Sequence, residues 1–147
     1  MKRNYKGLLN LDYIEVRNVP IVKNENRGEG VESQVLGQVE RLAARAILGK
    51  KLPIRGLEIQ FFRKVLAMSQ KQLGLALGYS DVAILKWERA KLNRLDPVNE
   101  VAVRALMAEK FGVKIKGTFE ALLGGDKTPR KLVVAYQSQE DELDKAS

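Results

Sequence analysis

The 147-residue sequence contains no cysteine and no histidine. Without cysteine the chain forms no disulfides or thiolate metal sites, and without histidine it lacks imidazole bases and the usual ligands of zinc and haem. No apolar run approaches the ~20 residues that a membrane span requires. Residues 1–16 also lack the apolar core and the small-residue cleavage site of a signal peptide. We therefore expect a cytoplasmic protein with no membrane association and no cofactor.

The remaining composition is typical of a soluble globular protein, with 45% hydrophobic and 30% charged residues. A chain of this length forms one domain, or one small domain with appendages. It can bury roughly two-thirds of its unfolded surface, so folding needs no metal or disulfide. No pair of carboxylates stands out as an acid–base couple, because Glu29, Glu32 and Glu40 lie in or beside a polar loop. Together these features favour a protein that is not an enzyme.

Positive charge is concentrated in the middle of the chain. The net charge is +8 and the pI about 9.8, and twelve basic but only three acidic residues lie between Arg41 and Arg94. Residues 139–147, in contrast, form an acidic tail. A basic domain of this kind favours a polyanionic partner, most simply double-stranded DNA. A solvated cationic surface with no specific partner is the alternative.

The N-terminal third combines strand and helix patterns. Residues 5–23 are rich in Tyr, Ile, Val and Leu, and they predict a β-hairpin or two short strands on either side of Arg17 and Asn18. Residues 24–33 predict a polar loop. Residues 33–49 have helical apolar spacing and end with a glycine. The apolar face of this helix fits either a dimer or partner interface, or packing on the N-terminal strands.

The middle of the sequence predicts four helices with recognisable ends. The first covers residues 54–67, and the third turns Ile84 and Trp87 toward the core. The second helix has Ser69 as its N-cap, with Gln72 as the partner in a capping box, and it ends at Gly78. The third helix has Ser80 as its N-cap. The fourth has Asp96 as its N-cap and Pro97 at its first position, and it ends at Gly112.

The C-terminal part contains one clear strand candidate, residues 131–136. We expect it to pair with Tyr13–Val16 or Val19–Val22 and so to join the two ends of the protein. This gives four segments: an N-terminal hairpin-and-helix unit (1–50), a helical domain (53–112), a C-terminal extension with a strand (113–138) and the acidic tail (139–147).

A helix, a turn with glycine and a second helix between Ser69 and Lys91 have the spacing of a helix-turn-helix. In this motif the second helix enters the major groove with its N-terminal part, while its other face packs on the preceding helices. The outward positions of the second helix are Asp81, Val82, Leu85 and Lys86. The cations placed around them to meet phosphate are Lys71, Arg89, Lys91 and Arg94.

Residues 53–112 resemble the Xre, or lambda-repressor-like, helix-turn-helix family. The family typically has Ser or Thr followed by Gln at the start of helix two, a Gly at its end, and a Trp-Glu-Arg-Gly run at the end of helix three. The matching residues are Ser69, Gln70, Gly78, Trp87, Glu88 and Arg89, with Ala90 where the family often has Gly. The expected fold is therefore mainly α, a lambda-repressor-like helix-turn-helix bundle with small β elements at the N- and C-terminal ends.

The resemblance implies DNA contact for particular side chains. Lys86 can donate to guanine O6 or N7, and Val82 can touch a thymine methyl. Asp81 either accepts from cytosine N4 or serves as an acid in the first turn of its helix. We interpret Arg63 and Lys64 as solvated or phosphate-facing. The expected DNA-binding residues are Gln70, Lys71, Ser80, Asp81, Val82, Leu85, Lys86, Arg89, Lys91 and Arg94.

The order of parts is similar to that of antitoxins of the MqsA type, in which a small β-containing unit and a helix precede the Xre domain. In that family the N-terminal unit commonly holds zinc through Cys-x-x-Cys pairs, and the present chain has no cysteine. We expect a transcriptional regulator, most simply a repressor, that binds a near-palindromic operator as a homodimer. The alternative is an antitoxin whose N-terminal unit binds a toxin or another protein partner.

Overall fold

The computed structural model describes residues 2–8, 10–26 and 28–137, so the acidic tail expected at 139–147 lies outside the described residues. The helices are α1 (Ser33–Gly49), α2 (Gly56–Val65), α3 (Gln70–Leu77), α4 (Asp81–Arg89), α5 (Pro97–Phe111) and α6 (Phe119–Leu122). The strands are β1 (Lys2–Leu8), β2 (Leu11–Pro20), β3 (Val22–Asn24), β4 (Gly28–Gly30) and β5 (Leu132–Ala135). A mainly helical chain with strands near both ends was the prediction, and at this level it is confirmed.

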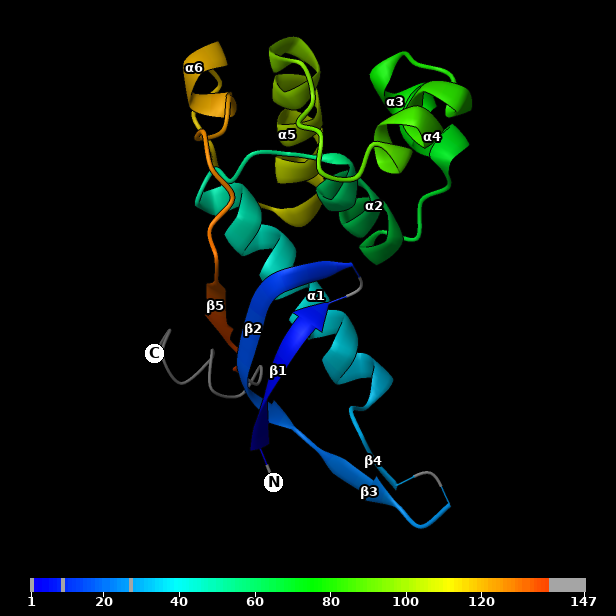
Figure 1. Cartoon of the computed structure of the whole chain (residues 1–147), viewed down its shortest axis with the longest axis vertical. Helices are drawn as coiled ribbons and strands as arrows, with labels where there is room; N and C mark the ends of the chain where they lie inside the picture. Colours follow the sequence, from blue (N-terminus) through cyan, green and yellow to red (C-terminus); the bar gives the residue numbers. More distant parts are fainter. Residues whose placement is uncertain (1, 9, 27, 138–147) are drawn as a thin grey trace.

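The strands gather at one end of the molecule and the helices α2 to α6 at the other, with α1 running between them (Figure 1). A three-stranded sheet has the order β1-β2-β5, in which β1 is antiparallel and β5 parallel to β2. Ile14 of β2 pairs with Leu132 of β5. The expected pairing between the C-terminal strand and residues 13–16 is therefore confirmed, and it brings the two ends of the chain together.

The prediction that Arg17 and Asn18 separate two strands is wrong, because β2 continues through both residues. Asn18 has a positive φ of 63°, a conformation that Asn adopts more readily than most residues. At this place the register shifts: Arg3 pairs with Val19, but Tyr5 pairs with Val16. The extra residue forms a β-bulge inside one strand. Residues 24–33, expected as a loop, instead include part of a small hairpin formed by β3 and β4.

Helix α1 packs on β2 and β5, and at its C-terminal half on α2 and α5. Its buried face contains Val39, Ala43, Ala44, Ile47 and Leu48. This arrangement favours packing on the N-terminal strands over a partner interface for the buried face of this helix. The helix does not end in a left-handed glycine, because Lys51, with a φ of 54°, takes that conformation instead.

The predicted ends of α3, α4 and α5 are confirmed. Ser69 and Gln72 form a capping box, and Ser80 accepts a hydrogen bond from the N–H of Ala83 at 3.2 Å. Gly78 and Gly112 end their helices with φ values of 80° and 69°, which glycine adopts without steric cost. The core that α3, α4 and α5 share with α2 includes Ile59, Phe62, Leu73, Ile84, Val103, Met107 and Phe111.

Candidate nucleic-acid interface

Two glycines allow α2 and α3 to lie close to α4 and the turn before it. A Cβ atom on Gly74 of α3 would lie 2.5 Å from the carbonyl oxygen of Tyr79, in the turn before α4. A Cβ on Gly56, the first residue of α2, would lie 2.1 Å from the carbonyl oxygen of Trp87 on α4. Both distances are too short for any residue with a side chain. The sequence therefore permits α2 and α3 to approach α4 through backbone contact.

The two apolar residues predicted to face inward from α4 differ in burial. Ile84 is fully buried. Trp87 is half-buried and packs against Tyr79, with ring centroids 5.0 Å apart in an edge-on arrangement. The Tyr79 hydroxyl donates to Asn99 of α5 at 2.6 Å. The turn between α3 and α4 is thus fixed to the start of α5, which sets the orientation of α4.

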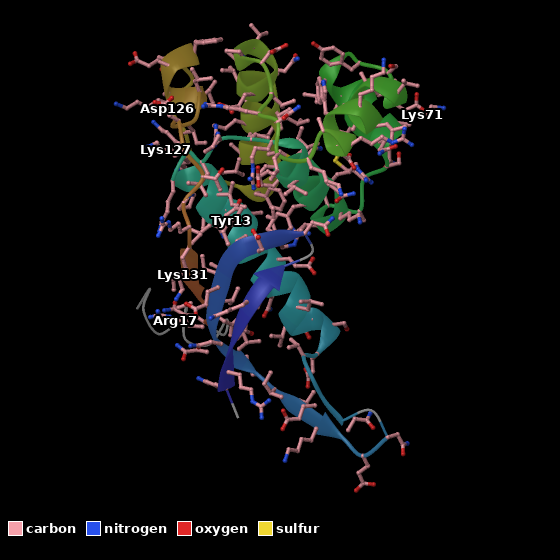
Figure 2. All side chains as sticks on the ribbon, viewed as in Figure 1. Tyr13, Arg17, Lys71, Asp126, Lys127 and Lys131 are labelled. Atoms are coloured by element: carbon pink, nitrogen blue, oxygen red, sulfur yellow. The ribbon has the colours of Figure 1, made fainter. Side chains whose placement is uncertain are left out.

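Most of the predicted contact residues lie on the surface. Lys71, Ser80, Asp81, Val82, Lys86, Arg89 and Lys91 are exposed, and Gln70 and Leu85 are half-buried. Figure 2 shows Lys71 at the outer edge of the α3–α4 end, far from Lys127 on the opposite side of the helical region. The apolar side chain of Val82, at the start of α4, is 54% exposed.

Asp81 acts locally at the start of α4. Its Oδ1 accepts a hydrogen bond from the N–H of Val82 at 2.9 Å. A carboxylate in this position also interacts favourably with the positive end of the helix dipole. These contacts agree with the first-turn role that was one of the two alternatives for this residue.

Arg63 is not solvated or phosphate-facing, which corrects the interpretation from sequence. Its side chain is 15% exposed and forms an ion pair with Glu88 of α4. The Nη1 atom donates to the carbonyl oxygen of Met68 at 3.1 Å. The hydrogen bonds to Glu88 raise the pKa of Arg63 above its ordinary value. Gln70 is attached to the same carboxylate, since its Nε2 donates to Glu88 Oε1 at 3.4 Å.

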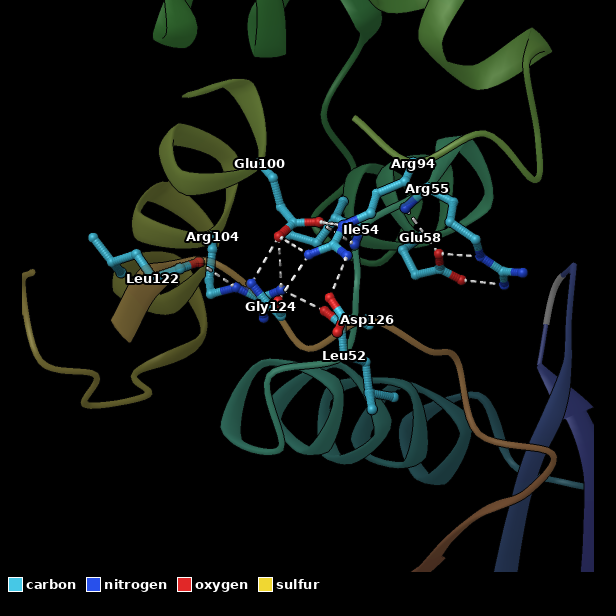
Figure 3. Close-up of polar contacts among 10 residues, drawn as sticks. All are labelled: Leu52, Ile54, Arg55, Glu58, Arg94, Glu100, Arg104, Leu122, Gly124 and Asp126. Carbon is cyan, nitrogen blue, oxygen red and sulfur yellow. Dashed lines mark hydrogen bonds and ion pairs between the residues drawn. The ribbon is translucent and has the colours of Figure 1, made fainter. Parts of the chain in front are cut away.

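Arg94 also differs from the expectation that it surrounds the groove contact. Its Nε donates to Glu100 Oε1 at 2.7 Å, and its Nη2 donates to Glu100 Oε2 at 2.9 Å and to the Gly124 carbonyl at 2.8 Å. Figure 3 shows this side chain at the centre of a polar network that also reaches Arg104 and Asp126. The guanidinium is therefore engaged inside the protein and joins α5 to the C-terminal extension.

Glu100 is fully buried at the centre of this network. Besides Arg94, its carboxylate accepts from the backbone N–H groups of Ile54 at 3.0 Å and Gly124 at 2.7 Å. Burial raises the pKa of Glu100, but these hydrogen bonds outweigh it and hold the pKa below the usual range. Sequence patterns give no sign of such a buried charge, because its partners lie 6, 24 and 46 positions away.

The ion pairs redistribute the positive charge of residues 41–94. Arg55, Arg63 and Arg94 pair with Glu58, Glu88 and Glu100. Nine cations of this segment form no ion pair within the described part of the chain. Four of them lie on α1 or directly after it: Arg41, Arg45, Lys50 and Lys51. The other five lie on α2, α3 or α4 or directly after α4: Lys64, Lys71, Lys86, Arg89 and Lys91.

A groove of about 420 Å³ lies beside α4. Its lining includes three of the predicted contact residues with side chains that can bind anions, Gln70, Arg89 and Lys91. It also includes Asn10 and Gln60, which the sequence did not indicate. Asn10 Nδ2 donates to Gln60 Oε1 at 2.5 Å across a separation of 50 residues, so no local pattern in the sequence could have brought them together.

Comparisons with protein-family models, with curated proteins and with solved structures find no match for this chain. Throughout residues 2–8, 10–26 and 28–137, no helix has the length and apolar character needed to cross a membrane. The same residues contain no group of three or more acidic side chains arranged to hold a metal ion. The surface around α3 and α4 carries the exposed residues Lys71, Ser80, Asp81, Val82, Lys86, Arg89 and Lys91, and this surface is the candidate site.

Proposed function

We propose that this chain is a sequence-specific DNA-binding regulator of transcription that acts in the cytoplasm. In this proposal α3 and α4 form a lambda-repressor-like, Xre-type helix-turn-helix, and α4 is the recognition helix. The observation that carries the proposal is the exposed outer face of α4, together with exposed cations on the same helix pair: Lys71 on α3, and Arg89 and Lys91 at the end of α4. Asp81, Val82 and Lys86 are exposed on α4, and a major groove admits one helix whose exposed side chains can reach the base edges.

Each part of this surface has a chemical counterpart in DNA. Lys86 reads guanine, Val82 contacts a thymine methyl, and Ser80 and Leu85 complete the face toward the bases. Lys71, Arg89 and Lys91 neutralise phosphates, and phosphate contacts supply most of the affinity of such complexes. The N-terminus of α3, beginning at Gln70, presents backbone N–H groups to a phosphate.

The proposed assembly on DNA is a homodimer. One recognition helix reads only a few base pairs, so specificity for one operator requires two copies. The two α4 helices then meet half-sites about one helical turn, roughly 34 Å, apart on a near-palindromic sequence. The proposed output is repression by occlusion, and the resemblance to antitoxins extends this to autoregulation.

The test measures binding to genomic fragments, including the chain's own upstream region, over a salt series. We expect one fragment to be bound tightly at ~0.15 M salt and its footprint to contain a near-palindrome. Lys86→Ala should weaken binding to that fragment by about 10-fold or more, as the loss of one base contact does. Lys127→Ala is the matched control, because it removes the same charge on the opposite side of the helical region.

Two outcomes would count against the proposal. Equal binding of all fragments that disappears steeply with salt would indicate a charged surface without base recognition. Unchanged affinity of a variant with both Lys86→Ala and Gln70→Ala would show that α3 and α4 are not the contact face.

The antitoxin alternative is favoured by one observation at the other end of the molecule. β1 is an edge strand of the sheet β1-β2-β5, and an edge strand offers backbone N–H and C=O groups to a strand of another protein. A stable complex between this chain and the product of a neighbouring gene in size-exclusion chromatography would support it. Separate elution of the two proteins would exclude that pair.

A further inference from the structure

The tip of the β1–β2 hairpin reaches the same side of the molecule as the candidate recognition helix. Asn10, in the turn between these strands, is exposed and donates to Gln60 of α2. Both side chains line the groove beside α4 that also contains Gln70, Arg89 and Lys91. The groove is therefore shared between the N-terminal sheet and the helical domain.

The hairpin is anchored where it approaches α2. Leu11, the first residue of β2, is fully buried. Two residues further, the Tyr13 hydroxyl donates to Glu58 of α2 at 3.1 Å, and the Arg55 guanidinium lies 5.7 Å from the Tyr13 ring centroid. Burial, followed by the nearby Glu58 carboxylate, raises the pKa of Tyr13, so the hydroxyl stays protonated and remains a donor. These contacts fix the position of Asn10 in the lining of the groove.

The chemistry of the groove suits one nucleotide of a DNA backbone. Arg89 and Lys91 supply positive charge, and the amides of Asn10, Gln60 and Gln70 supply N–H donors, all of which phosphate oxygens accept. Leu57 and Leu85 give an apolar wall against which a deoxyribose can pack.

Glu88 also lines the groove, but its effect on an anion is limited. Both of its oxygens accept hydrogen bonds from Arg63. Its side chain is only 4% exposed. The Arg63 guanidinium thus neutralises the Glu88 carboxylate, and the net charge that faces the groove is positive.

We propose that the hairpin tip and α2 extend the DNA-binding surface, and that this groove binds a backbone phosphate beside the half-site. The inference rests on the proposed function, because it assigns a further contact to the same complex. It also gives the N-terminal sheet a direct role on DNA, in addition to any role in binding a protein partner. The contact is to the backbone, so it acts on affinity for every sequence.

The test compares full-length wild type with Asn10→Asp and Gln60→Glu, each of which places a negative charge in the groove. Asn26→Asp adds the same charge on the exposed turn between β3 and β4 and serves as the control. Fluorescence anisotropy measures binding to the operator and to an unrelated duplex between ~50 and ~200 mM salt. We expect both groove variants to bind both duplexes at least about 5-fold more weakly at the low salt, and the salt slope to fall by about one.

Thermal unfolding of each variant distinguishes loss of contact from loss of fold. Asn10→Ser, which shortens the side chain without adding charge and suits a turn, replaces Asn10→Asp if that variant has a lower Tm. Wild-type affinity of the groove variants on both duplexes would overturn the inference and leave the proposed function intact. Failure of the wild type to bind any operator would overturn both.

Discussion

The guanidinium of Arg63 on α2 holds the carboxylate of Glu88 on α4 through two parallel hydrogen bonds. Nε donates to Oε2 and Nη2 donates to Oε1, each at 2.8 Å. The two side chains are 15% and 4% exposed, so the pair is largely removed from water. Since Gln70 of α3 also reaches this carboxylate, three helices meet at one buried ion pair.

Breaking this pair from one side should be costly. Glu88→Ala is expected to lower the free energy of unfolding by about 3 kcal/mol, because it leaves the Arg63 guanidinium buried without a counter-charge. The double variant Arg63→Met, Glu88→Leu should recover most of this loss, since no unpaired charge then remains. Urea unfolding of the wild type, of the single variants Arg63→Met and Glu88→Leu, and of the double variant gives the coupling energy. Additive losses would mean that the two residues do not interact.

Two glycines in helices should respond in opposite directions to the same substitution. Gly37→Ala in α1 adds a Cβ that meets nothing within 4 Å, so it should stabilise the protein by about 0.5–1 kcal/mol through helix propensity. Gly74→Ala in α3 should destabilise it by more than about 2 kcal/mol, because the new Cβ would lie 2.5 Å from the Tyr79 carbonyl oxygen. The urea midpoints of the two variants, compared with that of the wild type, measure both changes in stability. A neutral Gly74→Ala would show that α3 can move away from the turn.

The helical region was predictable because its signals are local. A capping residue and its partner are three positions apart, as Ser69 and Gln72 are. A helix-ending glycine such as Gly78 or Gly112 acts through its own backbone conformation. Such signals need no knowledge of the tertiary structure, and both bounds of α3 and α5 and the start of α4 follow from them.

The groove and the buried ion pairs were not predictable for the opposite reason. Arg63 and Glu88 are separated by 25 positions, and Asn10 and Gln60 by 50. The residues next to an arginine in the sequence do not show whether its side chain is solvated or bound to a distant carboxylate. The same limit explains Asn18, because only the pairing with β1 shows that its turn-like conformation is a bulge inside a strand.

The buried carboxylate of Glu100 should make stability dependent on acid pH. Its pKa in the folded protein is lowered, relative to an unfolded value of about 4.3. The unfolded state therefore binds the proton more readily, and the stabilisation is present above that value and is lost as the pH falls through the folded pKa. Glu100→Gln should reduce stability at pH 7 and flatten its decline as the pH falls below the unfolded value. Urea midpoints at pH values above and below that value provide the measurement, and parallel curves for the two proteins would contradict the assignment.

Asp81→Asn should decide between the two roles left open for this side chain. If Asp81 acts through its own helix, the variant loses about 0.5 kcal/mol of stability from the helix dipole. Removing a negative charge near phosphates should then strengthen binding to all duplexes by about 2- to 5-fold at low salt. Glu109→Gln, on the exposed end of α5, is the matched charge control. Anisotropy titrations with the operator and an unrelated duplex give the answer. Weaker binding to the operator alone would instead assign Asp81 to a cytosine N4 contact, because only a base contact depends on sequence.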